Sequence, residues 1–198
     1  MSNTLKTHLQ FLWAALLKQP QTGSIIPSQR FLINRMIAPV PEDYSGRVIE
    51  LGAGSGALTH RLAERCPGAQ ILACEINHSL ARVNRSSLAA AGIDATRVKV
   101  VADSAENLLS KLGHDGSDKA DFIISGIPIG NFPRERALTI VEAVKETLRP
   151  GGLYIQFQYF LADHAKIRKR FARMRTIPVL LNFPPAFVYY AQKSAGSD

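Results

Sequence analysis

A run of nine residues, 48–56, constrains the fold of this chain more than any other feature. It reads Val-Ile-Glu-Leu-Gly-Ala-Gly-Ser-Gly, so an apolar strand passes directly into a turn with glycine at every second position. Glycine has no Cβ and tolerates positive φ, so such a turn lets a ligand approach the backbone closely. Residues 57–65 then have the pattern of a helix. The run predicts the first strand, turn and helix of a nucleoside-binding α/β fold; an ordinary buried turn is the alternative.

Glu50, at the end of this strand, indicates which ligand suits the turn. A dinucleotide-binding turn spaces its glycines as Gly-x-Gly-x-x-Gly and holds a pyrophosphate at the helix N-terminus. Here the spacing is Glu-x-Gly-x-Gly-x-Gly, and a carboxylate before the turn repels pyrophosphate but attracts a cation. S-adenosylmethionine has no phosphate and carries a sulfonium and an ammonium group. We therefore expect Glu50, Gly52, Gly54 and Gly56 to bind S-adenosylmethionine.

Strand and helix patterns alternate along the rest of the chain. Strands are predicted at residues 70–75, 97–101, 120–125 and 153–159, and helices at 79–91, 104–112 and 134–148. Two last strands, 177–182 and 186–192, are separated by a Pro-Pro turn with no helix between them. Repeated strand-helix units build a parallel sheet with helices on both faces. The prediction is an α/β fold with a mostly parallel seven-stranded sheet and an antiparallel C-terminal hairpin.

Two helices are expected ahead of the sheet. Residues 5–16 place four leucines and Trp13 on one stripe, which is typical of an amphipathic helix, and Phe11 on the opposite side suits a lipid headgroup layer. Pro27 suits the first turn of a second helix, which runs towards Ile37. We therefore predict an N-terminal helical extension, residues 1–40, that contacts a membrane or covers the site, and a cofactor-binding domain, residues 41–198.

Acidic residues close the second and third strands, where ligands bind in an open α/β sheet. Glu75 is placed to accept both hydroxyls of a ribose. Asp103 is placed to accept a hydrogen bond from the exocyclic amine of adenine. Capping of a helix N-terminus is the alternative for each of them. Asn77, Ser104 and Ser125 complete the expected cofactor site.

The expected reaction site is the turn after the fourth strand, residues 125–133, which reads Ser-Gly-Ile-Pro-Ile-Gly-Asn-Phe-Pro. Amine methylases often hold the acceptor nitrogen on side-chain and carbonyl oxygens at this point, and Ser125 and Asn131 are the candidates here. Ile129 stands where such a turn has an aromatic residue, so a planar base has less to stack on. A flexible aliphatic amine is the better fit. A proline-rich connection that only ends the strand is the alternative.

The charge of the chain favours an anionic partner. Lys and Arg number 24 against 16 Asp and Glu, for a formal net charge of +8, which suits nucleic acid or an acidic membrane. Residues 165–175 concentrate cations around an apolar stripe and predict a basic amphipathic helix on a membrane; binding to RNA phosphates and a merely solvated face are the alternatives. The candidates to hold a lipid phosphate are Lys166, Arg168, Lys169, Arg170 and Arg173.

Cysteines and apolar runs are both sparse. Cys66 and Cys74 are too few for a disulfide framework or a metal-ligand cluster, so we expect no metal and a reducing compartment. No apolar run approaches the about 20 residues that cross a bilayer. We expect a cytoplasmic protein that associates peripherally with the inner face of the cytoplasmic membrane.

Taken together, these motifs resemble the bacterial phosphatidylethanolamine N-methyltransferases of the soluble, S-adenosylmethionine-dependent type. The resemblance covers nearly the whole chain. It rests on the glycine turn, on Glu-Ile-Asn at 75–77, on the 125–133 turn, on Leu-Arg-Pro-Gly-Gly at 148–152, on Gln-Phe-Gln-Tyr at 156–159 and on Gly-Ser-Ile-Ile-Pro-Ser at 23–28. It implies a Rossmann-like class I methyltransferase fold. It also implies methyl transfer to the amine of phosphatidylethanolamine or its methylated derivatives, the route to phosphatidylcholine, with S-adenosylhomocysteine as the other product.

The sequence departs from that family at two positions. Ala53 replaces the more usual proline of the glycine turn, and Gly130 stands where a larger aliphatic residue is common. The second change leaves the preference among amines open. Tyr159, at the end of the fifth strand, is the candidate to orient the amine and to hold the quaternising nitrogen by a cation-π contact; an aromatic packed in the core is the alternative.

Two other functions remain as alternatives. An rRNA adenine methyltransferase would carry much the same glycine turn, but such enzymes resemble Asn-Leu-Pro-Tyr at the reaction site and the aromatic is missing here. A non-enzymatic peripheral membrane-binding protein would not need the complete set of glycine and acidic positions. We expect the partners to be an anionic membrane and a phospholipid substrate rather than nucleic acid.

Overall fold

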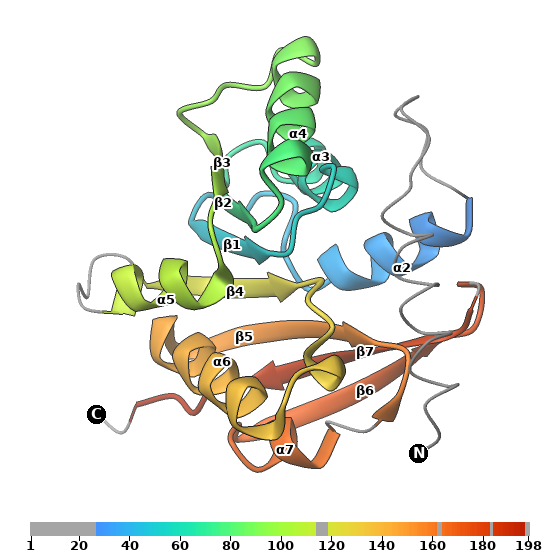
Figure 1. The fold of residues 1–198 in the computed structure, drawn as a ribbon, viewed down its shortest axis with the longest axis vertical. Coiled ribbons are helices and arrows are strands. Elements are labelled where there is room, and N and C mark those ends of the chain that lie inside the picture. The colour runs from blue at the N-terminus through green and yellow to red at the C-terminus, as the bar shows by residue number, and fades with distance from the viewer. Residues whose placement is uncertain (1–26, 114–118, 162–163, 183, 197–198) are drawn as a thin grey trace.

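A seven-stranded sheet forms the centre of the molecule (Figure 1). The computed structural model describes residues 27–113, 119–161, 164–182 and 184–196. The strand order is β3-β2-β1-β4-β5-β7-β6, and β7 alone runs antiparallel to its neighbours. This confirms the predicted mostly parallel sheet with an antiparallel C-terminal hairpin. The strands are β1 (Arg47–Leu51), β2 (Gln70–Glu75), β3 (Val98–Ala102), β4 (Ala120–Ser125), β5 (Leu148–Gln158), β6 (Arg173–Val179) and β7 (Ala186–Gln192).

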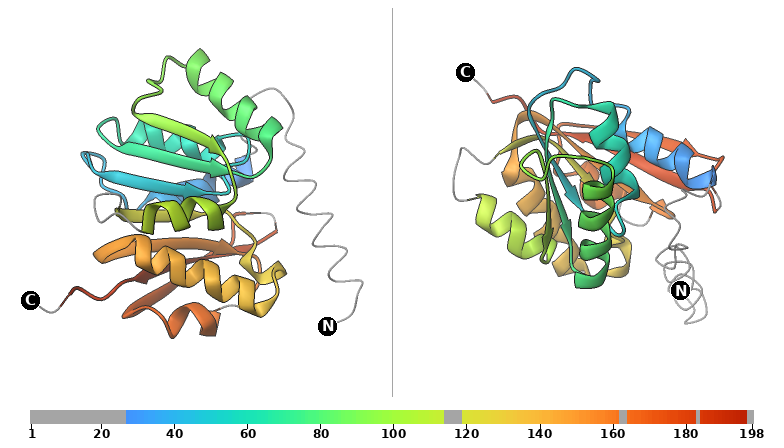
Figure 2. Two further views of the ribbon diagram at one scale, coloured as in Figure 1. Left: turned by 60° about the vertical axis from the view of Figure 1, so that its left-hand side comes forward. Right: turned by 90° about the horizontal axis from the view of Figure 1, so that it is seen from above.

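Helices cover both faces of this sheet (Figure 2). The first face carries α2 (Pro27–Ile37), α3 (Ala57–Arg65) and α4 (His78–Ala90). The second face carries α5 (Ala105–Gly113), α6 (Arg134–Thr147) and α7 (His164–Arg168). A short 3-10 helix, Ile129–Asn131, lies between β4 and α6. The connections that follow β1 and β4 lead to opposite faces, so the edge of the sheet is open between these two strands.

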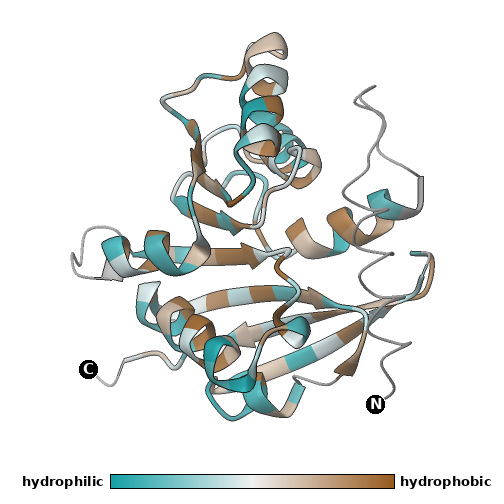
Figure 3. Cartoon of the chain, in the orientation of Figure 1, coloured by the Kyte–Doolittle hydropathy of each residue, from teal (hydrophilic) through white to brown (hydrophobic). Residues whose placement is uncertain are grey.

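Side chains along each strand alternate between the two faces of the sheet, so each face has its own apolar core. Val48 and Ile155 point into the core under α2, α3 and α4, while their neighbours Ile49 and Tyr154 point into the core under α5, α6 and α7. All four side chains are buried. The central strands thus bury apolar side chains on both faces, which is the pattern expected of parallel strands, and Figure 3 colours most of β4 as hydrophobic.

Helix α2 belongs to the core of the domain. Leu32, Met36 and Ile37 are buried in the first-face core, and the hydroxyl of Tyr190 on β7 donates a hydrogen bond to the carbonyl of Arg35. The bounds of α2 confirm the helix predicted from Pro27. The described part of the predicted extension, residues 1–40, therefore packs as part of the domain. Trp13 and the amphipathic helix expected around it lie outside the described residues and stay a prediction.

Most predicted helices begin and end within one or two residues of their observed bounds. Gly92 follows α4 with a φ of 69°, and its N–H donates to the carbonyl of Ala89, as expected for a glycine that ends a helix. Helix α6 stops at Thr147, but β5 already begins at Leu148, five residues before the predicted strand. The Pro-Gly-Gly segment thus lies inside the strand, beside a register irregularity between β4 and β5.

Two predictions near the C-terminus are wrong. The basic segment 165–175 is not one helix, because α7 ends at Arg168 and the chain enters β6 at Arg173. The strand predicted at 177–182 lies earlier, since β6 ends at Val179. Pairing with β7, from Arg173 opposite Gln192 to Val179 opposite Ala186, overrides the local helical pattern. Proline is tolerated in β6, at Pro178, because β6 is an edge strand of the sheet.

None of the helices in the described ranges is both long and apolar enough to cross a bilayer.

Replacing Ile37 by Ala tests whether α2 is part of the domain. Ile37 is 2% exposed, so the truncation leaves a cavity and should lower the free energy of unfolding by about 2–5 kcal/mol. Asn34→Ala, on the exposed side of the same helix, should change it by less than about 0.5 kcal/mol. Urea denaturation measures both. Equal, small effects would mean that α2 is only loosely attached.

Candidate functional site

Two pockets meet at the carboxyl ends of β1 and β4, where the connections diverge to opposite faces of the sheet. The first pocket lies on the side of α2 and α3, and the second lies on the side of α5 and α6. Both are lined by Gly52, Gly54 and Gly126, so the glycine turn forms a ridge between them. An elongated ligand that lies across this ridge would occupy both pockets. This is the position at which open α/β sheets bind ligands.

The glycines of the turn serve different purposes. All three have positive φ, at +76° for Gly52, +56° for Gly54 and +103° for Gly56. A Cβ on Gly54 would meet no atom within 4 Å, so this side of the turn is open to a ligand. A Cβ on Gly56 would lie 2.2 Å from Oδ1 of Asn84, so this glycine makes room for helix α4. The expectation that every glycine clears a path for the ligand therefore does not hold for Gly56.

Glu50 is buried at the floor of the first pocket. Its Oε2 accepts a hydrogen bond of 2.7 Å from the hydroxyl of Thr59, and that hydroxyl accepts one of 3.1 Å from Nδ2 of Asn84. Burial raises the pKa of the Glu50 carboxyl to about 8, against the weaker opposing effect of the Thr59 hydrogen bond, and the nearby charge of Glu75 raises it further. At neutral pH the carboxyl is mostly protonated, and a cation in the pocket would favour its ionised form.

Glu75 ties the glycine turn to the end of β2. Its Oε2 accepts from the N–H of Gly54 and its Oε1 from the N–H of Asn77, each at 2.8 Å. Each carboxylate oxygen can accept a second hydrogen bond. Because Glu75 also lines the second pocket, it can hold the turn and still accept a pair of ligand hydroxyls.

Asn77 and Ser104, which follow β2 and β3, cap the first turns of two helices. Oδ1 of Asn77 accepts from the N–H groups of Ser79 and Leu80, and the hydroxyl of Ser104 accepts from the N–H of Asn107. Neither residue lines the two pockets. In this structure Asn77 and Ser104 thus cap the first turns of α4 and α5, and their expected part in the cofactor site stays a prediction.

Asp103 combines a local role with a place in the wall of the second pocket. Its Oδ2 pairs with Nζ of Lys111 at 2.8 Å, and its Oδ1 accepts from the N–H of Ser104 at 2.8 Å. These hydrogen bonds, that from Lys111 foremost, hold the pKa of the Asp103 carboxyl below its usual range. The carboxylate is therefore ionised and ready to accept a donor from a ligand in the pocket.

Hydrogen bonds from residues of the turn itself and of β5 hold the turn after β4. Ser125 is fully buried and its hydroxyl accepts from the N–H of Ile127 at 3.2 Å, while Nε2 of Gln156 on β5 donates to the carbonyl of Ile127 at 2.9 Å. Ile129 is buried in the second-face core, and Asn131 is exposed on the 3-10 helix. The side chains of Ser125 and Asn131 thus line neither pocket, and the former shapes the turn.

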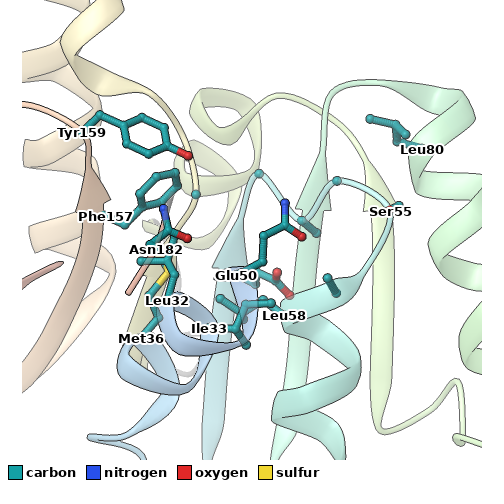
Figure 4. A pocket seen from close by; sticks show the side chains of 16 residues that line it. Leu32, Ile33, Met36, Glu50, Ser55, Leu58, Leu80, Phe157, Tyr159 and Asn182 are labelled. Atoms are coloured by element: carbon teal, nitrogen blue, oxygen red, sulfur yellow. The ribbon is translucent and has the colours of Figure 1, made fainter. Parts of the chain in front are cut away.

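An aromatic wall closes the far side of the first pocket (Figure 4). The rings of Phe157 and Tyr159 pack edge to face with their centres 5.4 Å apart. The Tyr159 hydroxyl is hydrogen-bonded to Asn182, and burial raises the pKa of this phenol to about 12. Leu32 and Met36 of α2 complete the apolar lining. Tyr159 thus lies across the first pocket from the glycine turn, and its role as the residue that orients the amine stays a prediction.

Asn182 was not predicted from the sequence. It sits in the connection between β6 and β7, is 3% exposed, and its Nδ2 donates to the carbonyl of Pro184 at 2.6 Å. The signal that could have found it is an asparagine within an apolar run just before a Pro-Pro pair. Two further lining residues were not predicted as site residues: Gln29 of α2, and Ile76, which lies within the Glu-Ile-Asn motif at 75–77.

The basic residues expected to hold a lipid phosphate do not gather at either pocket. Arg173 stands opposite Gln192, at the end of the sheet away from the pockets. The guanidinium of Arg170 pairs with Glu142 of α6. Lys166 and Arg168 belong to α7, on the second face, and Lys169 directly follows it. These five residues line neither pocket, so a common phosphate site is not formed by them in this structure.

The thiols of Cys66 and Cys74 are free and buried. Within the described ranges, no three His, Cys, Asp or Glu side chains are grouped so that they could hold a metal ion.

Comparison with known proteins gives a family and several relatives. The model of the family described as methyltransferase domain matches residues 48–152. The ornithine lipid N-methyltransferase of Singulisphaera acidiphila is 29% identical over 172 residues, which cover 86% of this chain and 88% of the relative. The ribosomal RNA large subunit methyltransferase G of Shewanella amazonensis is 27% identical over 149 residues, but these cover 37% of that longer protein.

Solved structures share the fold at low identity. The 16S rRNA N2 G1207 methyltransferase of T. thermophilus, solved with AdoMet and guanosine, has a TM-score of 0.64 at 24% identity and covers 87% of this chain; the chain spans 44% of that protein. The 1,6-didemethyltoxoflavin-N1-methyltransferase of Burkholderia thailandensis, solved with S-adenosylhomocysteine, has a TM-score of 0.67 at 17% identity, covering 85% and 79% of the two chains. The Rossmann-like methyltransferase fold predicted from the sequence is confirmed.

The ionisation of Glu50 predicts a pH dependence of stability. The pKa of its carboxyl is about 8 in the folded protein and 4.5 in the unfolded chain, so between these values the folded protein keeps a proton that the unfolded chain has lost. Stability that is full below a pH of about 4.5 is therefore lost as the pH rises to about 8, at up to about 1.4 kcal/mol per pH unit. Glu50→Gln should abolish this decline in chemical denaturation.

The matched control is Glu135→Gln, at an exposed position of α6, whose pH profile should follow the unsubstituted protein. If the profiles of Glu50→Gln and the unsubstituted protein coincide, Glu50 is ionised in the folded state.

Proposed function

Because the chain belongs to the methyltransferase-domain family, whose members use S-adenosylmethionine, we propose that it methylates the amine of a membrane lipid. The substrates proposed are phosphatidylethanolamine, its methylated derivatives, or an ornithine lipid. The observation that carries the proposal is the first pocket, an apolar and aromatic hollow that opens directly beside the glycine turn. Its apolar and aromatic lining suits an amine on a flexible aliphatic stem. The relative from Singulisphaera acidiphila, which aligns over most of both chains, supports a lipid acceptor.

The residues of the ridge fit the cofactor. Two carboxyl groups, Glu50 and Glu75, flank a turn that is open at Gly54, and such a set suits a cationic ligand with ribose hydroxyls better than a pyrophosphate. In this proposal Glu75 and Asp103 bind the nucleoside in the second pocket, and Glu50 lies near the charged amino-acid end in the first. Gly52 and Gly54 permit close approach, while Gly56, Asn77, Ser104 and Ser125 support the turns around them.

The acceptor amine is proposed to bind between the ridge and the aromatic wall. The bound cofactor supplies an electrophilic methyl group. The faces of Tyr159 and Phe157 stabilise a nitrogen that becomes positively charged, by cation-π contact, and Asn182 orients the Tyr159 hydroxyl. Since the pKa of Tyr159 is about 12, its hydroxyl stays protonated at neutral pH and positions the amine without taking its proton. Positioning and exclusion of water supply the catalysis.

Methylation of ribosomal RNA is the second candidate. Two of the relatives act on rRNA according to their names, and the chain is basic. The alternative is the weaker one because Ile129, where an aromatic would stack on a base, is buried in the core, and because the first pocket is walled by aliphatic side chains of α2.

Methyl transfer from labelled S-adenosylmethionine tests the proposal. The acceptors are mixed vesicles of phosphatidylethanolamine with an anionic lipid, the same vesicles with ornithine lipid, and ribosomal RNA in parallel. We expect label in the lipid fraction, and chromatography then identifies the lipid and the number of methyl groups added. Label in RNA alone would replace the lipid proposal by the RNA one.

Tyr159→Ala should separate acceptor binding from cofactor binding. Loss of a cation-π contact predicts a fall of about tenfold in kcat/KM for the lipid. The dissociation constant of S-adenosylmethionine, measured by calorimetry, should not change, because Tyr159 lies across the pocket from the glycine turn. Tyr159→Phe keeps the ring and should retain most of the activity. Unchanged turnover of every acceptor by Tyr159→Ala would remove Tyr159 from the site.

A further inference from the structure

Large apolar side chains are exposed around the mouth of the first pocket. Across the described residues seven large hydrophobic side chains are exposed, and five of them directly adjoin segments that line this pocket. We call these five the collar: Phe31, Phe160, Leu161, Leu180 and Leu181. The last two are 75% and 67% exposed. Exposed apolar clusters of this kind on a folded domain mark surfaces that contact a partner molecule or a membrane.

The collar is built from three separate segments. Phe31 precedes Leu32 on α2, Phe160 follows Tyr159 after β5, and Leu181 precedes Asn182 after β6; the second residue of each pair lines the first pocket. Figure 1 shows that the start of α2, the end of β5 and the connection between β6 and β7 all lie on one side of the molecule. Three segments far apart in sequence thus lie on one side of the molecule, and each carries an exposed large apolar residue next to one that lines the first pocket.

The charge of these segments complements an anionic surface. Helix α2 carries Arg30 and Arg35 and no acidic residue, and residues 159–161 and 180–185 contain no charged residue at all. The whole chain has a formal net charge of +8. Apolar side chains that enter lipid, with cations beside them, are the composition that binds an anionic bilayer. RNA would gain little from five exposed Leu and Phe side chains.

We propose that the collar inserts into the headgroup layer of an anionic bilayer, so that the lipid amine enters the first pocket directly from the membrane. This inference rests on the proposed function, because it supplies that site with its substrate. It replaces the basic segment 165–175 as the surface expected to meet the membrane. Only the headgroup of the lipid then leaves the bilayer, and its acyl chains stay among the collar side chains.

The test compares Leu180→Ser/Leu181→Ser with the unsubstituted full chain and with Val83→Ser, an exposed apolar position on α4 that lines neither pocket. Burial of one leucine changes an equilibrium by about tenfold or more, so the double variant should bind vesicles of phosphatidylethanolamine and phosphatidylglycerol at least about tenfold more weakly. Val83→Ser should bind as the unsubstituted protein does. Vesicle sedimentation measures the binding, and the melting temperature confirms folding.

Turnover distinguishes the surface from the active site. On vesicles, the double variant should lose activity together with binding, while its turnover of dispersed, water-soluble dihexanoyl phosphatidylethanolamine should stay unchanged. A second variant, Phe160→Ser/Leu161→Ser, should behave in the same way.

Unchanged vesicle binding in both double variants would overturn the collar, and residues 1–26 would then be the segment that meets the membrane. Faster turnover of the soluble lipid by the double variants would also overturn this proposal. It would mean that another part of the chain covers the collar in water. Failure of the proposed function has a different signature: vesicle binding that depends on the collar, without methylation of either lipid.

Discussion

The carboxylate of Glu75 holds together the two turns on which the site depends. One oxygen accepts from Gly54 in the turn after β1, and the other accepts from Asn77 at the start of α4. A charged acceptor with two backbone donors is among the stronger hydrogen-bonding arrangements available to a protein. These hydrogen bonds fix the position of the glycine turn relative to the sheet. The two pockets on either side of the turn therefore keep their shape. Loss of this carboxylate would disturb both pockets at once.

The ridge between the pockets explains how one small domain can bring together two unlike ligands. The second pocket is lined by the carboxyl groups of Glu75, Asp103 and Glu106, whereas the first is apolar and aromatic around a buried carboxyl. A polar nucleoside and the amine of a lipid therefore favour opposite sides of the same turn. The reacting atoms of both can meet at Gly52, Gly54 and Gly126, which line both pockets and have no side chains to separate the ligands.

Membrane contact and catalysis are linked through short segments of chain. Tyr159 and Asn182 face the pocket, and their sequence neighbours Phe160 and Leu181 face outwards. In the proposed arrangement, a bilayer that holds the collar would also hold the aromatic wall in position. The basic residues of β6 would contribute to this only through the overall charge, because β6 begins at the far end of the sheet.

The sequence by itself determined the order of strands and helices, the glycine turn and the acidic residues Glu50, Glu75 and Asp103, because hydrophobic period and turn chemistry are local properties. It also indicated Tyr159. Only the tertiary structure decided that residues 173–179 form an edge strand, that α2 belongs to the core, and that Asn182 reaches the pocket. These outcomes depend on strand pairing and burial between segments far apart in the chain. Such long-range interactions produce no periodic pattern in the sequence of the segments that make them.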